Sequence, residues 1–245
     1  RLNVGVQGLA ISERAYQKAL SFSKERIQGY SLNKNITGPV EIIKHPDVKR
    51  MLMEMKSQTE AMRGLAITTG NFIDKYKNFP NSPEGKECLF ISNLLTPIVK
   101  AWCTDQSIYI TSLGVQVHGG MGFIEDTGAA QYYRDCRILA IYEGTNGIQA
   151  IDLVTRKLKI SDGFAIKNFL DEMKETSNKC SEKNDNDFIK IANNLNAAIA
   201  EVEICTEKLL EWTKENKLRS VLFSASDYLE LFGITAGSHY LSRGA

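Results

Sequence analysis

The sequence has no excess of either charge and no long apolar run. Its 245 residues contain 30 Lys and Arg against 29 Asp and Glu, which gives a formal net charge of +1. Balanced charge provides no electrostatic basis for binding a polyanion or an anionic lipid surface, so we expect neither nucleic acid nor a membrane as a partner. A helix that crosses a bilayer needs about 20 consecutive apolar residues. Polar residues interrupt every apolar stretch here, which predicts that the chain does not span a membrane.

The sequence also lacks the patterns of a disulfide framework or a metal site. It has five cysteines and three histidines, with no CxxC pair and no histidine spacing that suits a metal. We therefore expect no metal, and the odd number of cysteines predicts a reducing compartment, such as the bacterial cytoplasm or the mitochondrial matrix. The cysteines are Cys88, Cys103, Cys136, Cys180 and Cys205.

Apolar residues recur three and four positions apart through most of the chain, which is typical of amphipathic helices. Gly29 is expected to end the first helix and Asp47 to cap the second. Pro97 is expected to kink the third helix or to mark a boundary. No alternating β-branched window is long enough for a sheet, so the predicted fold is all-α. The predicted helices of this bundle cover residues 1–28, 48–73, 85–113, 129–139 and 145–158. Methionines expected to fill its interior are Met51, Met53, Met55 and Met62.

A change in composition predicts a second, smaller unit. Residues 159–186 are polar and rich in Lys and Asn, which indicates a linker with a short helix. Helical periodicity returns at residues 187–215 and 220–241, and the last of these is too apolar for a solvated tail. We therefore expect a helical bundle at 1–158 followed by a linker and helical C-terminal extension at 159–245, with the extension docked on the bundle or on a neighbouring subunit.

The most informative segment is the glycine-rich stretch that begins near residue 114. Four glycines stand within nine residues, where a soluble bundle has no packing reason for them: Gly114, Gly119, Gly120 and Gly122. Glycine lets a backbone come close to a flat or charged ligand because it has no Cβ. A tight turn that needs positive φ explains one glycine equally well, and for the cluster both explanations stay open.

The motifs around this stretch resemble the C-terminal domain of the acyl-CoA dehydrogenases, flavoproteins that oxidise an acyl-CoA thioester between its α and β carbons. The family's Gln-x-x-Gly-Gly-x-Gly-Phe turn is matched at residues 116–123, its Arg-Asp pair at 134–135 and its Ile-Tyr-Glu-Gly-Thr motif at 141–145. Upstream, Glu25, Arg26 and Gly29 match its Glu-Arg-x-x-Gly pattern. The C-terminal sequence is similar to a subgroup that includes methylthiopropanoyl-CoA dehydrogenases.

The resemblance implies a catalytic site at the Ile-Tyr-Glu-Gly-Thr motif. It makes Glu143 the base that removes the α-proton, and its own backbone N–H would polarise the thioester carbonyl. Ile141 and Tyr142 are expected to give Glu143 an apolar setting that raises its pKa. The alternative is a Glu that caps a helix. Residues matched to the substrate side are Arg1, Tyr142 and Gly144.

The resemblance also implies FAD as the cofactor. The matched cofactor-binding residues are Arg26, Gln28, Gln116, Gly119, Gly120 and Thr145. In the family the glycine turn contacts the flavin of a neighbouring subunit, which implies a homodimer or homotetramer. The sequence departs from the family pattern at two places, which weakens the match for individual flavin contacts. Gly147 replaces a Gln that is common in the family, and residues 27–30 do not cleanly match the family's aromatic residue.

The expected function is therefore α,β-dehydrogenation of an acyl-CoA to a 2-enoyl-CoA, with an electron-transfer flavoprotein as the electron acceptor. One alternative is an acyl-CoA oxidase, which passes electrons to oxygen. Another is a helical scaffold or nucleic-acid-repair relative that has lost dehydrogenation, although the near-neutral charge and the presence of Glu143 argue against it. Because the chain begins at Arg1 with no leader, we expect it to be the C-terminal part of a longer polypeptide and inactive alone.

Overall fold

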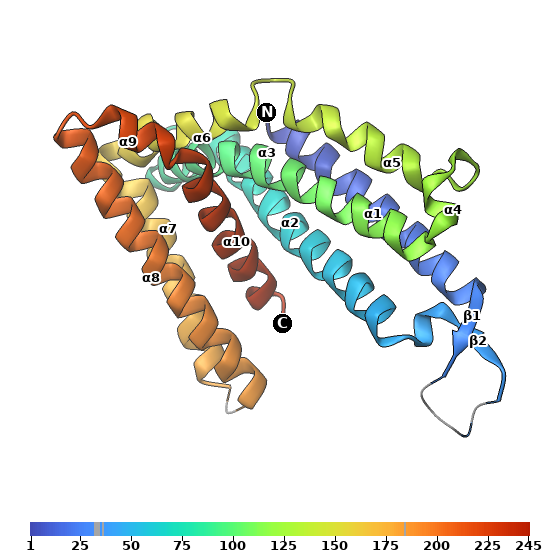
Figure 1. Ribbon diagram of the computed structural model, residues 1–245. Coiled ribbons are helices and arrows are strands. Elements are labelled where there is room, and N and C mark those ends of the chain that lie inside the picture. The colour runs from blue at the N-terminus through green and yellow to red at the C-terminus, as the bar shows by residue number, and fades with distance from the viewer. Residues whose placement is uncertain (32–34, 36, 184) are drawn as a thin grey trace.

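A computed structural model describes residues 1–31, 35, 37–183 and 185–245. It is dominated by helices (Figure 1), which confirms the all-α fold. The helices are α1 Leu2–Glu25, α2 Pro46–Asn78, α3 Pro83–His118, α4 Gly120–Phe123, α5 Ala129–Cys136, α6 Asn146–Thr155, α7 Phe164–Ser181, α8 Asn186–Lys214, α9 Leu218–Phe223 and α10 Ala225–Arg243. Short 3-10 segments are η1 Ile42–Lys44, η2 Glu125–Thr127, η3 Arg137–Ala140 and η4 Lys157–Gly163.

The long helices α1, α2 and α3 pack side by side, and α3 contacts both of the others (Figure 1). Two glycines on α1 permit a close approach to α3. A Cβ on Gly5 would lie 2.6 Å from the Val99 carbonyl oxygen, and one on Gly8 would lie 2.7 Å from the Cys103 carbonyl oxygen. This contact sets how far α1 is shifted along α3, and so fixes what lies at each end of α1.

The first helix is shorter than predicted because the chain becomes extended at Arg26. A two-stranded antiparallel ribbon follows, formed by β1 Ile27–Tyr30 and β2 Pro39–Glu41. Gly29 lies in β1 with a φ of 76°, so it does not end the helix. Residues 32–34 and 36, between β1 and β2, lie outside the described residues.

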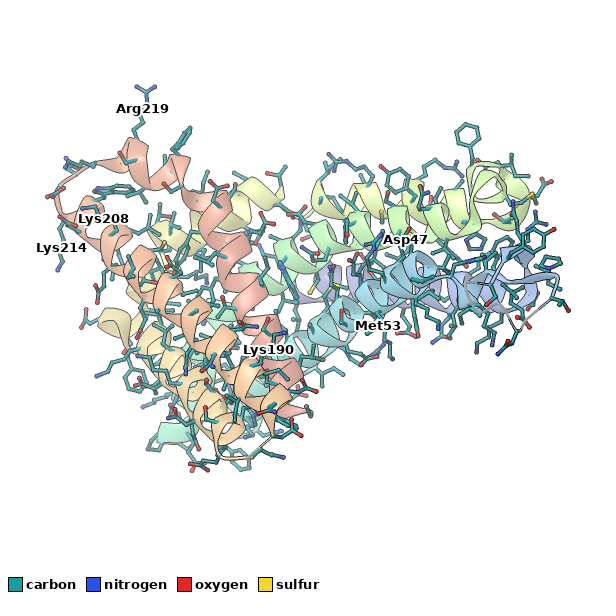
Figure 2. The ribbon with its side chains drawn as sticks, turned by 60° about the horizontal axis from the view of Figure 1, so that its bottom comes forward. Asp47, Met53, Lys190, Lys208, Lys214 and Arg219 are labelled. Atoms are coloured by element: carbon teal, nitrogen blue, oxygen red, sulfur yellow. The ribbon has the colours of Figure 1, made fainter. Side chains whose placement is uncertain are left out.

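The structure of helix α2 differs from the prediction in two details, at Asp47 and Met53 (Figure 2). Asp47 is not the cap, since His45 occupies that position and Asp47 lies in the first turn, where its carboxylate pairs with Arg50 at 2.8 Å. Met53 is 72% exposed and does not fill the interior. The other three methionines are buried as expected.

Helix α3 extends past both predicted ends and continues through Pro97, so the boundary alternative there is wrong. Its start is set by Ser82, whose Oγ accepts the N–H of Gly85 at 2.9 Å. The helix also includes Gly114 and ends at His118, where the chain turns at Gly119.

The predicted linker is largely helix α7, which packs along α8. Its charged residues are exposed or half-buried, whereas Phe169 and Met173 are fully buried. Residue 184, at the end of the predicted linker, lies outside the described residues. The last predicted helix is divided at Ser224 into α9 and α10.

The C-terminal helix α10 docks against α2, α3 and α6, which confirms that the extension packs on the bundle (Figure 1). Trp102 of α3 lies under two glycines of α10. A Cβ on Gly233 would lie 2.4 Å from Trp102 Cγ, and one on Gly237 would lie 2.5 Å from its Cη2. One apolar core therefore extends from the bundle into the extension.

Within the described residues, no helix has the length and apolarity that a membrane crossing requires. The same part of the chain holds no cluster of three or more His, Cys, Asp or Glu side chains suited to a metal ion. The five cysteines are free thiols.

Candidate active site

The residues predicted to form the site fall into two groups at opposite ends of α1. Arg1 precedes this helix and Arg26 follows it, and 24 residues at about 1.5 Å each place the two ends about 36 Å apart. At the first end the Tyr142 hydroxyl donates to Gln7 Oε1 of α1. At the second end the turn after α3 lies beside the residues that follow α1 (Figure 1).

The turn before α6 has a left-handed backbone at two successive positions, with a φ of 57° at Glu143 and 85° at Gly144. This conformation costs a non-glycine residue about 1 to 2 kcal/mol, so other contacts must hold it. The Nε2 group of the fully buried Gln149 donates hydrogen bonds to the carbonyl oxygens of Glu143 at 3.4 Å and Gly144 at 3.2 Å. Thr145 caps α6 by accepting the N–H of Ile148 at 3.4 Å. The capping alternative for Glu143 is therefore wrong.

The side chains around Glu143 do not enclose it within this chain. Ile141 is 47% exposed, Tyr142 is 37% exposed, and Glu143 itself is exposed. The expectation that these neighbours bury Glu143 is therefore wrong for this chain taken by itself. A carboxyl pKa rises when the group is removed from water, so a dry setting for Glu143 would come from surfaces outside these residues.

Arg1 is anchored to α6 and is not a frayed terminal charge. Its Nη1 lies 3.0 Å from Asp152 Oδ2, and the other oxygen of that carboxylate lies 2.7 Å from Arg156 Nε. The Asp152 side chain is only 9% exposed, whereas Arg1 is 43% exposed. This pairing ties the start of α1 to α6 and keeps part of the Arg1 guanidinium accessible at the same end as Glu143.

The three glycines after α3 have three different explanations. A Cβ on Gly122 would lie 2.3 Å from the Val115 carbonyl oxygen, so this glycine is required by packing. Gly119 has a φ of 59° and a ψ of −141°, a conformation that glycine adopts without strain. A Cβ on Gly120 would meet no atom of the described residues within 4 Å. The fold therefore does not require glycine at 120, and this position is open to a ligand.

Arg26 and Gln28 lie at the same end as this turn. The Phe22 ring in the last turns of α1 stacks on the His118 ring of α3, with centroids 4.4 Å apart. Beyond that contact, Arg26 Nη2 donates to Gln28 Oε1 at 3.3 Å, and both side chains are exposed. Gln116, in the last turn of α3, is exposed as well.

Comparison with models of known protein families shows which family this chain belongs to. A model described as "Acyl-CoA dehydrogenase, C-terminal domain" matches residues 1–158, and one described as "Acetyl-CoA dehydrogenase C-terminal like" matches residues 169–245. This chain belongs to the acyl-CoA dehydrogenase family.

Two curated members of the family illustrate the similarity. The chain is 47% identical to the 3-methylmercaptopropionyl-CoA dehydrogenase of Ruegeria pomeroyi over 74% of this chain and 31% of that protein. It is 31% identical to a butyryl-CoA dehydrogenase of Syntrophomonas wolfei over 100% of this chain and 40% of that protein. The chain thus spans less than half the length of these relatives.

Solved structures of the family share the fold. Caenorhabditis elegans ACDH-11 in complex with C11-CoA superposes with a TM-score of 0.77 at 19% identity, covering 99% of this chain and 39% of that one. A Bacillus anthracis acyl-CoA dehydrogenase complexed with FAD gives a TM-score of 0.74 at 19% identity, covering 100% of this chain and 42% of that one.

The family motifs did not reveal every residue that shapes the turn at Glu143. Gln149 holds its carbonyl groups, and Lys100 of α3 donates to Asn146 at the start of α6. A signal was present in the sequence, since Lys100 stands among the apolar residues of the predicted third helix. Periodicity alone does not say what such a lysine contacts.

Proposed function

We propose that this chain is the C-terminal part of a FAD-dependent acyl-CoA dehydrogenase, which converts an acyl-CoA thioester to a 2-enoyl-CoA. The observation that carries the proposal is the Glu143 turn, a carboxylate on a left-handed backbone held by a buried Gln149. Family membership and the names of the relatives support the reaction class. The division into a bundle at 1–158 and an extension at 159–245 is part of the same proposal.

In this proposal Glu143 removes the α-proton, and its backbone N–H donates to the thioester carbonyl as negative charge develops there. Arg1, Tyr142 and Gly144 form the substrate side of the site. Tyr142 is oriented by its hydrogen bond to Gln7, and Arg1 by its pairing with Asp152. The remainder of the full-length protein would cover Glu143 and exclude water from it.

The surface at the other end of α1 suits FAD. Gly120 leaves space for close approach of a ligand, and Arg26 presents a guanidinium that can bind a pyrophosphate through paired hydrogen bonds. When bound, FAD supplies the hydride acceptor. The residues proposed to hold it are Arg26, Gln28, Gln116, Gly119, Gly120 and Thr145.

These residues imply more than one subunit at each site. Thr145 adjoins Glu143 and precedes Asn146, which contacts α3 at Thr104, whereas Gly120 follows the end of α3, about 21 Å farther along that helix. We therefore assign Thr145 to the flavin of its own subunit and the glycine turn to the flavin of a neighbour. The active species is a homodimer or homotetramer, in which each site is completed by two chains.

We also propose an electron-transfer flavoprotein as the electron acceptor and the cytoplasm as the location. The alternative, an acyl-CoA oxidase, differs in the acceptor. The test is anaerobic mixing of the full-length flavoprotein with acyl-CoAs of varied length, including a methylthio-substituted one. Bleaching of the flavin, followed by reoxidation by an electron-transfer flavoprotein and not by oxygen, is the expected result. Fast reoxidation by oxygen would indicate the oxidase, and no bleaching by any acyl-CoA would contradict both.

A further inference from the structure

Lys100 lies in the interior of the bundle, where a lysine is unusual. Its side chain on α3 has no exposed surface, although lysine is almost never fully buried unless it is paired. Its Nζ donates to Asn146 Oδ1 at 2.7 Å. Burial lowers the pKa of Lys100, and the nearby Asp105 carboxylate opposes that shift. The proposed reaction gives this group no chemical step, so its placement needs another explanation.

Both the oxygen and the nitrogen of the Asn146 side-chain amide form hydrogen bonds. Its oxygen faces the Lys100 ammonium, and its Nδ2 donates to Asp105 Oδ1 at 2.7 Å. The same Nδ2 lies 2.9 Å from Thr104 Oγ1 and 3.2 Å from the Ala101 carbonyl oxygen. Hydrogen bonds to charged groups are about twice as strong as neutral ones. A cation on the oxygen side and an anion on the nitrogen side therefore fix the orientation of this amide.

This network fastens the turn of Glu143 to α3. Asn146 is the first residue of α6 and follows Glu143 by three positions. Gln149 holds the carbonyl groups of the turn from the α6 side, but it cannot fix α6 itself. The hydrogen bonds from Asn146 to α3 fix the position of α6. Helix α1, which Arg1 precedes, packs on the same helix α3.

We propose that Lys100, Asn146 and Asp105 form a positioning clamp that sets the place of the Glu143 carboxylate for removal of the α-proton. The clamp rests on the proposed function, because it assumes that Glu143 is the base. None of its three residues touches the reacting atoms in this proposal. Loss of the clamp shifts Glu143 and slows proton removal, while acyl-CoA contacts made elsewhere are kept.

The test uses the full-length flavoprotein and measures flavin reduction by acyl-CoA as a rate per bound flavin at saturating substrate. We expect Asn146→Ala to lower this rate by about ten- to a hundredfold, the range that a misplacement of about 1 Å can produce. The dissociation constant of acyl-CoA should change little. The matched control is Asn93→Ala, which removes an amide of α3 that is half-buried like Asn146 and also accepts from a lysine, Lys157, at 3.4 Å. This control should keep the rate.

A charge exchange provides a rescue. Asn146→Asp sets a carboxylate beside Asp105 and should also slow reduction, because the two acids repel each other. Adding Asp105→Asn places the carboxylate against Lys100 and an amide donor beside it, so the rate per flavin should recover in part. A merely structural network would change thermal stability or flavin loading and leave the rate per bound flavin unaltered in every variant.

Glu143→Gln separates the clamp from the proposed function. If that variant loses bleaching while Asn146→Ala keeps the full rate per flavin, the clamp is overturned and the function stands. If Glu143→Gln itself bleaches at the wild-type rate, the proposed function fails. Should Asn146→Ala hold no flavin, Lys100→Met decides, because it keeps the aliphatic chain and removes the charge. An undiminished rate in Lys100→Met also overturns the clamp.

Discussion

The two ends of α1 are built in different ways. At the Arg1 end, buried polar side chains hold the backbone, with Lys100 and Gln149 fully buried and Asp152 nearly so. At the other end, Arg26 is exposed and bonded to an exposed neighbour, and Gly120 faces open space. Contacts within the chain fix the geometry of the first end, whereas the second end is an exposed surface that a bound ligand would cover.

This difference predicts how substitutions act at each end. Changes at the Arg1 end should alter the chemical step or the stability of the chain, because the groups there hold one another in place. Changes at the exposed positions of the Arg26 end, Arg26 and Gly120, should alter ligand affinity with little effect on folding, because few contacts within the chain depend on those residues. The experiments below can break or sharpen this contrast.

Glu143→Gln should give the largest effect. The substitution keeps the size of the side chain and removes the base, so acyl-CoA and flavin binding should persist. Flavin reduction by acyl-CoA should fall by on the order of a thousandfold, within the range that a positioned base contributes. Anaerobic stopped-flow absorbance of the full-length protein measures this, and an unimpaired rate would remove Glu143 from the mechanism.

The sequence predicted the elements whose contacts repeat along one helix. The helix at 187–215 is found as α8 within one residue at each end, since its buried residues recur at helical spacing. The segment that contains helix α7 is predicted to be a linker with only a short helix, because its many charged residues mask large buried side chains such as Phe169 and Met173. Helical spacing shows which face is apolar, but it is a weak guide when most positions are charged.

The site shows the same limit. Family motifs singled out Glu143 and the glycine turn from residue order alone. The bond between Lys100 and Asn146 joins residues 46 positions apart, and such a pairing depends on how α3 and α6 pack. The exposure of Glu143 was missed for a related reason, because apolar neighbours in sequence need not cover a side chain in space.

Gly233→Ala tests whether α10 supports the Arg1 end. A Cβ at this position would lie 2.4 Å from Trp102 Cγ, two residues along α3 from Lys100. We expect a loss of stability of about 3 kcal/mol, the upper part of the usual range for overpacking a core. Urea unfolding measures this. Ile234→Ala, at a 47% exposed neighbour on α10, is the control and should cost far less. Equal effects would show that the glycine contact with Trp102 is not what docks α10.

Two alanine substitutions in the glycine turn compare packing with ligand binding directly. Gly122→Ala places a Cβ against the Val115 carbonyl, and we expect a loss of about 1 to 2 kcal/mol because short α4 can shift to relieve it. Gly120→Ala should leave stability within about 0.5 kcal/mol. It should weaken FAD binding on the order of tenfold, or about 1.4 kcal/mol. Unfolding curves and FAD titrations of both variants provide the check. Unchanged FAD affinity in Gly120→Ala would exclude this glycine from the cofactor surface.

The smallest expected effect concerns the pH dependence that the buried Lys100 gives to stability. Burial holds the pKa of Lys100 below its ordinary value of 10.5 in the folded chain. Between the folded pKa and 10.5 the unfolded chain binds more protons, so this residue makes stability rise with pH in that window. Below the window both states are protonated and the contribution is constant. The difference in stability between the parent and Lys100→Met isolates it, since the other titrating groups are shared.

Lys56→Met is the control of opposite sign. The ion pair with Glu60 on the surface of α2 raises the pKa of Lys56 above 10.5. Here the folded chain binds more protons between 10.5 and the raised pKa, so the stabilising contribution of Lys56 is lost as pH increases. Urea unfolding at a series of alkaline pH values should therefore show the parent gaining stability relative to Lys100→Met and losing it relative to Lys56→Met. If the difference in unfolding free energy between the parent and Lys100→Met stays constant up to pH 10.5, Lys100 is not held in a dry interior. The contrast between the two ends of α1 would then no longer include a buried charge.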